Sequence, residues 1–369
     1  MKYKKVFIIS YLVSVALYFT GAVLVSGFLY YNIKQEKAYE SININSPIFI
    51  EDTSFPLFSG VSAKSAVLID GKSGAVLFEK DSDTRLYMAS TTKIMTALIA
   101  LEKLPLNTVV TVPKEATLVE GSSIYLRENE KITVETLLYG LLLESGNDAA
   151  HTLAVAVSGS PEKFAELMNE KAREMGLKNT LFANPHGLTD ENHYTTAYEI
   201  GFIASKAMKN PTFREMVSTK SKTIPSLDGE ITRYFSNHNK MLNMYPGAIG
   251  VKTGFTKAAG RCLVSAAERD GNMFIAVTLN DGNDWKDHSA MLDYGFENYK
   301  SISVAKENEF GVYFGTERYT NPQSIYLTAE KDSEVVLKYE VYKEEDKVYV
   351  VYYANGQNLG KFHLVKESL

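Results

Sequence analysis

The sequence of 369 residues contains one cysteine, Cys262, and only six histidines. A single cysteine excludes an intrachain disulfide, so packing alone must hold the fold together. Cys262 lies in an apolar run and is predicted to be a small buried residue of a strand. The histidines show no H-x-x-H pair or similar ligand spacing. The histidine spacing therefore predicts no metal site.

An excess of positive charge is also lacking, since the formal net charge is −5. Without a general basic face, nucleic acid is not expected as a partner. The composition, with 45% hydrophobic and 22% charged residues, is typical of a globular protein. A chain of this length is expected to form two domains rather than one.

Long apolar runs are absent except at the N-terminus, where Val6–Tyr31 follows three lysines within the first five residues. The run is long enough to span a bilayer, and the lysines would stay on the cytoplasmic side. Residues 1–33 are therefore predicted to be a single membrane anchor at the cell membrane, with the rest of the chain extracytoplasmic. The alternative is a cleaved signal peptide and a secreted protein. Residues 34–57 are predicted to be a linker.

The spacing of apolar residues changes along the rest of the chain. Helical segments between about residues 134 and 208 lie between β-rich segments at 65–79 and 262–279, and one of these helices is expected to begin at Pro161. Beyond about Ser301 the apolar residues alternate at strand period. Residues 301–369 are therefore predicted to form a small all-β C-terminal domain.

The stretch from Tyr87 to Ile99 contains Ser90 and, three residues later, Lys93, followed by apolar residues at helical spacing. In a helix Ser90 would lie in the first turn, and both side chains would point to one face. A lysine can take the proton of a serine nucleophile if burial or a neighbouring cation lowers the lysine pKa. The pair predicts acyl transfer through a covalent serine intermediate, although on its own S-x-x-K more often marks an ordinary helix start.

A second candidate, Ser145-Gly146-Asn147, interrupts two apolar helical segments. Ser145 can relay a proton toward a leaving amine. Asn147 can hold a substrate amide, and its own amide can fix Lys93 by hydrogen bonding. Taken alone, the tripeptide is typical of a turn between helices.

A third candidate, Lys252-Thr253-Gly254, precedes a β-rich stretch. Lys252 can bind a substrate carboxylate and help to keep Lys93 neutral, and Thr253 adds a hydroxyl for the same carboxylate. Gly254 leaves the strand bare for an extended substrate. The backbone N–H of Phe255, with that of the nucleophile, is predicted to form an oxyanion hole. Taken alone, such a lysine is typical of an edge strand.

In this order the three motifs resemble those of the low-molecular-mass penicillin-binding proteins, and more narrowly of the serine-type D-alanyl-D-alanine carboxypeptidases. Asn184–Leu188 and Thr195–Tyr198 also resemble stretches of that family. The resemblance covers about Phe58 to Tyr299, and the tail is similar to the C-terminal β domain of many members. Many members also end in an amphipathic anchoring helix, which this tail does not resemble. The N-terminal segment is therefore expected to provide any anchor.

The resemblance implies a mixed α/β catalytic domain, residues 58–300, with a β-lactamase/transpeptidase-like antiparallel sheet flanked by helices. It implies removal of the terminal D-alanine from peptidoglycan stem pentapeptides ending in D-Ala-D-Ala. The reaction would pass through an acyl-Ser90 intermediate with Lys93 as base. β-Lactam antibiotics would inhibit the enzyme by acylating Ser90. No cofactor or metal is implied.

Three alternatives stay open on the sequence. A serine β-lactamase shares S-x-x-K and K-T-G but needs a water activator, and Glu166 and Glu170 fall within the helix predicted from Pro161. A non-catalytic wall-binding scaffold could keep the fold, but it would be expected to have lost a motif residue. A transpeptidase would share the acyl-enzyme, because the sequence does not decide whether water or an amine takes the acyl group.

Overall fold

The structure, a computed structural model, describes residue 58 and residues 60–367. It divides into two compact units, each of which is described by itself. The larger unit holds the described residues up to Ile302 together with Tyr326–Ser333. The smaller unit holds Ser303–Ile325 and the described residues from Glu334 onward.

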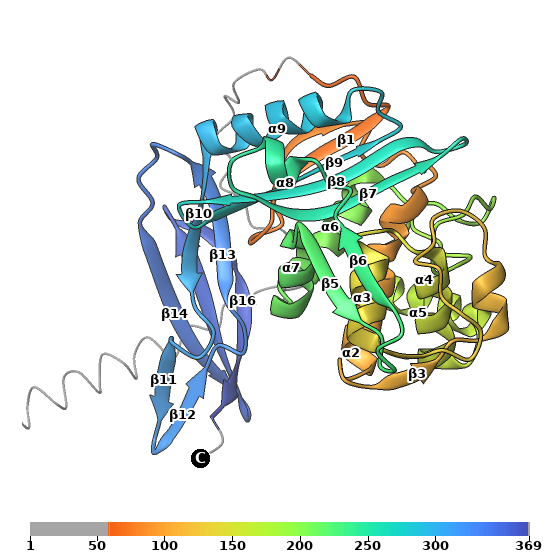
Figure 1. The fold of residues 1–369 in the computed structure, drawn as a ribbon. Helices are drawn as coiled ribbons and strands as arrows, with labels where there is room; N and C mark the ends of the chain where they lie inside the picture. The colour runs from red at the N-terminus through yellow and green to blue at the C-terminus, as the bar shows by residue number, and fades with distance from the viewer. Residues whose placement is uncertain (1–57, 59, 368–369) are drawn as a thin grey trace, which may run out of the picture. The chain divides into compact units, whose positions relative to one another are not determined.

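A five-stranded antiparallel sheet forms the centre of the larger unit, with the strand order β2-β1-β9-β8-β7 (Figure 1). Its strands are β1 (Ser65–Asp70), β2 (Val76–Lys80), β7 (Ala248–Thr256), β8 (Gly260–Arg269) and β9 (Asn272–Leu279). The β1–β2 hairpin, early in the chain, joins the late β7–β8–β9 meander because β1 pairs with β9, from Ser65 opposite Leu279 to Asp70 opposite Phe274. Segments some two hundred residues apart therefore form one sheet.

Both faces of this sheet are buried. Successive side chains of a strand point to opposite faces, and in this sheet both sets belong to a hydrophobic core. In β9, Ile275 and Val277 belong to one hydrophobic core and Phe274 and Ala276 to another. In β1, Val67 and Ile69 alternate with Ala66 and Leu68 in the same way. A sheet apolar on both faces needs helices on both sides.

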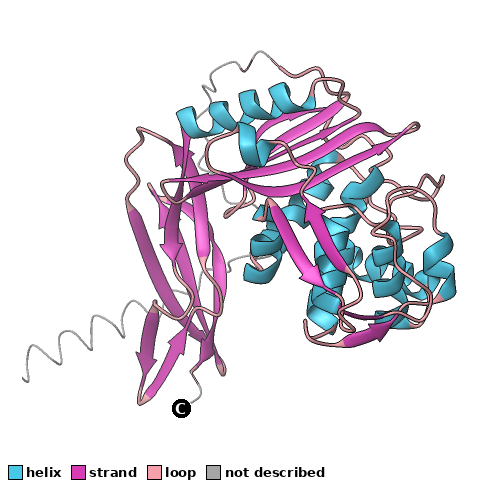
Figure 2. Ribbon diagram, viewed as in Figure 1, coloured by secondary structure: helices cyan, strands magenta, loops and turns pink. Residues whose placement is uncertain are grey.

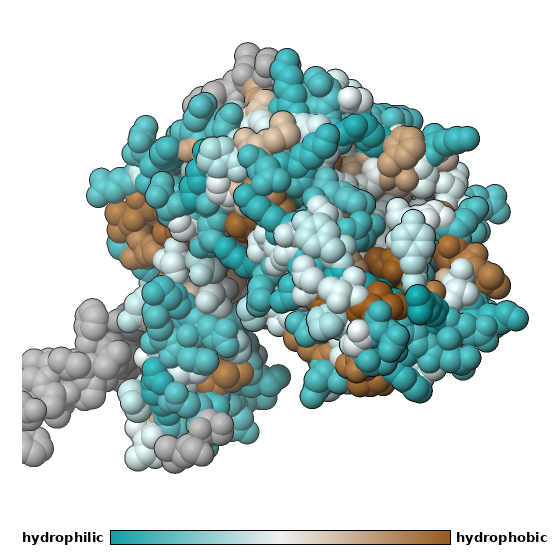
Figure 3. Space-filling view, viewed as in Figure 1, coloured by the Kyte–Doolittle hydropathy of each residue, from teal (hydrophilic) through white to brown (hydrophobic). Residues whose placement is uncertain are grey.

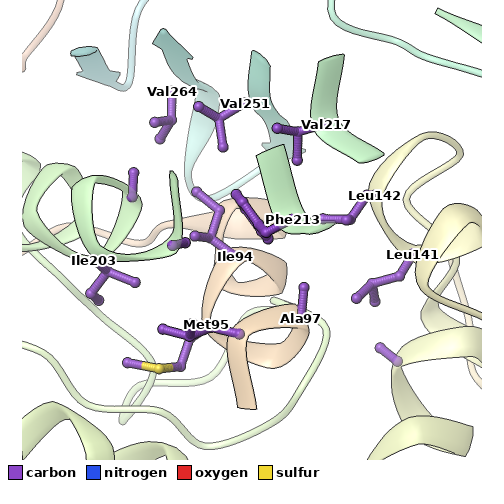
Figure 4. Close-up of a cluster of buried hydrophobic side chains, with 14 of the residues drawn as sticks. Ile94, Met95, Ala97, Leu141, Leu142, Ile203, Phe213, Val217, Val251 and Val264 are labelled. Carbon is purple, nitrogen blue, oxygen red and sulfur yellow. The ribbon is translucent and has the colours of Figure 1, made fainter. Parts of the chain in front are cut away.

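Helix α9 (Asp284–Asn298) covers one face, where Met291 and Leu292 join Phe274 and Ala276. The other face is covered by α2 (Lys93–Lys103), α6 (Ala197–Met208) and α7 (Pro211–Ser218). Figure 4 shows Ile94, Met95 and Ala97 of α2 among the side chains of α6, α7 and the sheet. Residues 93–100 of α2 are all buried, so the helix that begins at Lys93 lies inside the core.

The remaining elements of the larger unit surround this core (Figure 2). They are the turns η1 (Ala89–Thr92) and η2 (Lys114–Leu118), helices α3 (Val134–Leu142), α4 (Asn147–Ser158), α5 (Pro161–Glu174) and α8 (Met241–Met244), and the antiparallel strand pairs β3 (Val109–Thr111) with β4 (Lys131–Thr133) and β5 (Ser221–Pro225) with β6 (Thr232–Ser236). Local sequence sets the helix starts. Ser160 accepts a hydrogen bond from the Lys163 N–H, and Pro161 occupies the first helical position of α5.

The smaller unit contains a five-stranded sheet with the order β11-β12-β16-β15-β14. Its strands are β11 (Gly311–Phe314), β12 (Glu317–Thr320), β14 (Leu337–Glu344), β15 (Lys347–Ala354) and β16 (Gln357–Lys366). Two further strands, β10 (Tyr299–Ala305) and β13 (Ile325–Glu330), pair with each other and are shared between the units.

The predicted fold class is confirmed: an antiparallel sheet flanked by helices, with a C-terminal all-β part. Helix α7 and the β5–β6 hairpin were not predicted. Within the described part of the chain, no helix is both long and apolar enough to cross a bilayer. The predicted anchor in residues 1–33 lies outside that part, so it stays a prediction.

Candidate active site

Ser90 lies in η1, a tight 3-10 turn that leads directly into α2, rather than within the first α-helical turn as predicted. The reason is Ala89, whose φ of 46° is in the left-handed region that ordinary residues rarely adopt and that a helix excludes. The predicted consequence still holds, because the Lys93 Nζ lies 3.0 Å from the Ser90 Oγ.

A chain of hydrogen bonds supports this turn. The ring Nδ1 of His193 accepts from the Ala183 N–H, which places the ring hydrogen on Nε2. Nε2 then donates to the Thr92 Oγ1 at 2.7 Å, and the Thr92 hydroxyl donates to the Ala89 carbonyl at 2.8 Å. Burial lowers the pKa of His193 to about 4, so this relay is uncharged at neutral pH. It stabilises the unusual backbone beside the nucleophile.

The Lys93 side chain is fully buried and lies close to three oxygens. Besides the Ser90 Oγ, its Nζ contacts the Asn147 Oδ1 at 2.7 Å and the His186 carbonyl at 2.6 Å. A neutral amine has two N–H donors and one lone pair. When the two N–H groups donate to the Asn147 and His186 oxygens, the lone pair is left for the Ser90 hydroxyl.

Burial and repulsion both favour that neutral form. Desolvation lowers the pKa of Lys93 well below its ordinary value, and the charge of Lys252 lowers it further. The carboxylate of Asp148 acts in the opposite direction and is the weaker influence. Lys93 is thus set up as a base for Ser90.

The second motif lies between α3 and α4, where Ser145 has a φ of 63° and Asn147 begins α4. The Asn147 Nδ2 donates to the Glu120 carbonyl at 2.6 Å, which fixes the orientation of the amide and turns Oδ1 toward Lys93. The predicted contact between Asn147 and Lys93 is therefore present. Ser145 is 5% exposed.

Asp148, which was not singled out from the sequence, organises the loop opposite. Its buried carboxylate accepts hydrogen bonds from the Ser123 hydroxyl at 2.6 Å and from the N–H groups of Ile124 and Leu126 at 3.1 Å. The same loop accepts at the Ser122 carbonyl from the Asn147 N–H at 2.7 Å. Asp148, the residue directly after the S-x-N motif, thereby connects that motif to the loop that contains Ser122 and Ser123.

The third motif lies in β7, the edge strand of the central sheet. The Lys252 Nζ is buried and donates to the Thr253 carbonyl at 2.9 Å, and burial lowers the Lys252 pKa to about 7. A Cβ on Gly254 would lie 2.9 Å from the Ser90 backbone nitrogen. Only a glycine lets the strand pass this close to the nucleophile.

A pocket of about 520 Å³ connects the three motifs. It is lined by Ser90, Ser122, Ser145, His238, Thr253, Gly254, Phe255, Arg261, Cys262, Asp284 and Trp285. The Arg261 guanidinium binds the Asp284 carboxylate through two contacts, of 2.9 and 2.6 Å. Cys262 is buried in β8, as predicted. Lys93, Asn147 and Lys252 are not among the lining residues, but Lys93 contacts both Ser90 and Asn147, and Lys252 contacts the Thr253 carbonyl.

His186 was not predicted to take part, although Asn184–Leu188 was among the stretches of resemblance. It contributes its backbone carbonyl, and the pKa of its ring is lowered to about 3 by burial and by Lys93. The signal in the sequence is that the next residue, Gly187, is a glycine. In the structure its φ is 96°, in the left-handed region that favours glycine. A Cβ there would lie 2.0 Å from the Ala89 carbonyl oxygen, so this loop must pass directly against the nucleophile turn.

A serine beside a buried lysine, at the edge of an antiparallel sheet, is the arrangement of a serine hydrolase that uses lysine as its base. Residues 52–283 match the model of the family Peptidase_S11, described as D-alanyl-D-alanine carboxypeptidase. The chain belongs to this family, which confirms the resemblance and the predicted enzyme class.

Curated relatives carry the same description. The D-alanyl-D-alanine carboxypeptidase DacF of Bacillus subtilis (strain 168) is 38% identical over 256 residues, which are 67% of this chain and 65% of the relative. The chain thus matches slightly less than two thirds of that protein. The D-alanyl-D-alanine carboxypeptidase of Streptomyces sp. (strain K15) is 38% identical over 255 residues, which are 64% of this chain and 88% of the relative.

Solved structures have the same fold. The Streptomyces K15 DD-transpeptidase superimposes with a TM-score of 0.62 at 36% identity, covering 65% of this chain and 99% of the other. The D-alanyl-D-alanine carboxypeptidase DacD of Francisella tularensis gives a TM-score of 0.64 at 25% identity, covering 86% of this chain and 96% of the other.

Proposed function

We propose that this protein is a serine D-alanyl-D-alanine carboxypeptidase that removes the terminal D-alanine of peptidoglycan stem pentapeptides through an acyl-Ser90 intermediate. The observation that carries the proposal is the contact of 3.0 Å between the Ser90 Oγ and a Lys93 amine whose two N–H groups have carbonyl acceptors. The names of the family and of its relatives support a substrate that ends in D-alanyl-D-alanine.

In acylation, the neutral Lys93 takes the proton of the Ser90 hydroxyl as the oxygen attacks the carbonyl carbon of the penultimate D-alanine. The negative charge that develops on the carbonyl oxygen is stabilised by the N–H groups of Ser90 and Phe255. The C–N bond then breaks, and the proton reaches the leaving amine through the Ser145 hydroxyl. D-alanine departs and an ester on Ser90 remains.

Substrate binding uses the third motif. The Lys252 ammonium and the Thr253 hydroxyl bind the C-terminal carboxylate, while the bare edge at Gly254 pairs with the extended peptide. The second amide hydrogen of Asn147, the one that Glu120 does not use, binds the substrate amide. Water then attacks the ester, and the shortened peptide leaves. A β-lactam acylates the same hydroxyl and stays.

The β-lactamase alternative lacks support at this point. Glu166 and Glu170 lie on α5, as predicted, and neither lines the pocket. The acid that does line it, Asp284, is bound by Arg261. An efficient water activator for β-lactam hydrolysis is therefore not provided by the glutamates considered from the sequence.

We also propose that the apolar segment in residues 1–33 holds the enzyme at the cell membrane, with the catalytic unit outside the cytoplasm. The support is the apolar run Val6–Tyr31 after three lysines. Cell fractionation with protease accessibility tests this, and secretion without the segment would establish the signal-peptide alternative.

The function is tested by incubating the protein with a diacyl-D-alanyl-D-alanine peptide and measuring free D-alanine, alongside the Ser90→Ala variant. Release by the parent protein and none by the variant is expected. Rapid β-lactam turnover without release would establish a β-lactamase. Transfer of the acyl group to an added amine, with little hydrolysis, would establish a transpeptidase, the activity after which the Streptomyces K15 DD-transpeptidase is named.

The buried Lys252 gives the reaction a limit at high pH. Only the protonated amine binds a carboxylate, and the Lys252 pKa is lowered to about 7 in the free enzyme. We expect kcat/KM for the peptide to fall as the pH rises through that value, because kcat/KM reports the free enzyme. Lys252→Arg, which stays charged, should move the fall to higher pH. An unchanged profile in Lys252→Arg would remove Lys252 from carboxylate binding.

A further inference from the structure

A second groove, of about 410 Å³, lies beside the active-site pocket. Its lining includes Tyr125 and Arg127 from the loop that Asp148 organises, Glu144 from the turn between α3 and α4, and Arg233 and Tyr234 from β6. None of these residues has a role in the proposed reaction. On the face shown in Figure 3, apolar side chains gather in the region where β6 and α3 lie in Figure 1.

The groove adjoins the active-site pocket at two neighbouring pairs of residues. Ser122 lines the active-site pocket and Ser123, the next residue, lines the groove. The Glu144 Oε2 of the groove lies 3.1 Å from the His238 Nε2, and His238 lines the active-site pocket. A substrate larger than a short peptide can therefore occupy both.

Two tyrosines in this groove are unusually exposed. Tyr125 is 84% and Tyr234 is 65% exposed, whereas their neighbours Ile124, Arg233 and Phe235 are buried. Aromatic rings that face solvent at the edge of a binding pocket are typical of ligand contacts.

The backbone presents the Tyr125 ring on a fixed loop. Tyr125 has a φ of 57°, and its N–H donates to the Ser123 Oγ at 2.9 Å. The Ser123 hydroxyl in turn donates to the Asp148 carboxylate, which also holds the residues on both sides of Tyr125. Strained residues that the surrounding structure holds in place cluster at ligand-binding and active sites.

Two of the charged groups of the groove are already paired within the protein, whereas the Arg127 guanidinium makes no ion pair among the described residues. The Arg233 guanidinium binds both oxygens of Glu130, at 2.7 and 2.8 Å. Glu144 is paired with His238 and also accepts from the Ser236 N–H. The two exposed tyrosine rings and the Arg127 N–H groups are therefore left for a ligand, and they suit the C–H faces and hydroxyls of a pyranose ring.

We propose that this groove binds an amino sugar of the peptidoglycan glycan strand while the stem peptide occupies the active site. This rests on the proposed function, because the sugar arrives with that substrate. The shared chemistry is an N-acetylated pyranose, either on the strand that carries the stem peptide or on a neighbouring strand. Sugar binding would make polymeric peptidoglycan a better substrate than a free peptide.

The test compares D-alanine release from three substrates: the free pentapeptide, the same pentapeptide linked to its N-acetylglucosaminyl-N-acetylmuramyl disaccharide, and uncrosslinked polymeric peptidoglycan. We expect kcat/KM per stem peptide to rise about tenfold with the sugar, the effect of two stacking contacts. A rise with the disaccharide identifies the strand of the stem peptide. A rise with the polymer alone identifies a neighbouring strand.

The tyrosine variants localise the effect. The double variant Tyr125→Ala/Tyr234→Ala should lose the sugar-dependent gain and keep the free-pentapeptide kcat/KM within about twofold, since neither ring is in the core. Tyr125→Phe/Tyr234→Phe should keep most of the gain. Tyr313→Ala, at a tyrosine that is also exposed but does not line the groove, should change nothing.

Other outcomes overturn the inference. The same activity on all three substrates in the parent protein would show that no sugar is bound, while the proposed carboxypeptidase would stand. An equal loss on the free pentapeptide in the alanine double variant would show that the groove binds peptide. No release from any substrate would instead overturn the proposed function itself.

Discussion

Lys93→Ala is expected to slow acylation of Ser90 by roughly 1,000-fold or more, the upper part of the range for removing a general base. The variant leaves the Ser90 hydroxyl in place but removes the one amine within 3.0 Å of it among the described residues. Second-order acylation by a fluorescent penicillin measures the effect directly, because that step does not depend on the peptide or on deacylation.

Two comparisons separate the loss of the base from a loss of the fold. Lys103→Ala removes an exposed lysine at the other end of the same helix and should acylate at the parent rate. Thermal unfolding of Lys93→Ala should stay cooperative, although the oxygens of Asn147 and His186 lose their donor at a cost of about 1–3 kcal/mol each. Labelling at the parent rate would exclude Lys93 as the base.

Gly187→Ala is expected to damage both stability and catalysis, although it adds a single methyl group. The new Cβ would lie 2.0 Å from the Ala89 carbonyl oxygen and 2.9 Å from the Ser90 nitrogen, and both are backbone atoms that cannot rotate away. We expect a loss of about 3 kcal/mol in the free energy of unfolding, from overpacking and a disfavoured φ together. A displacement of the nucleophile by about 1 Å would lower kcat/KM roughly 100-fold.

Gly159→Ala provides the matched control, because Gly159 has a φ of 86° and no atom within 4 Å of the new Cβ. The Gly159→Ala variant should lose only about 1 kcal/mol in the free energy of unfolding, the cost of a left-handed φ, and should keep full activity. Chemical denaturation and D-alanine release on both variants measure the difference. Equal effects in the two variants would show that the loop at Gly187 does not position the nucleophile.

The sequence was informative where chemistry depends on the type of side chain. Ser90, Lys93, Ser145 and Lys252 could be proposed because their spacing, helix and strand contexts fit one reaction, and the structure brings these motifs to one pocket. The β-rich segment predicted at residues 262–279 likewise corresponds to strands β8 and β9.

The sequence was less informative where backbone groups, rather than side chains, make the contacts of the site. The His186 carbonyl holds Lys93, yet any residue at that position has a carbonyl, so side-chain chemistry could not reveal the contact. Ala89 takes a left-handed φ that no alanine predicts by itself. The pairing of β1 with β9 joins distant segments, and local periodicity does not encode the partner of a strand.

The central claim, an ester on Ser90, is tested most directly by rapid quenching. The protein is mixed with a diacyl-D-alanyl-D-alanine peptide, stopped in acid within the first turnover, digested, and analysed by mass spectrometry. The account predicts the acyl group on the peptide that contains Ser90, and its absence from Ser90→Ala. An acyl group on another residue would contradict it. So would D-alanine release by both the parent protein and Ser90→Ala without a covalent species in either.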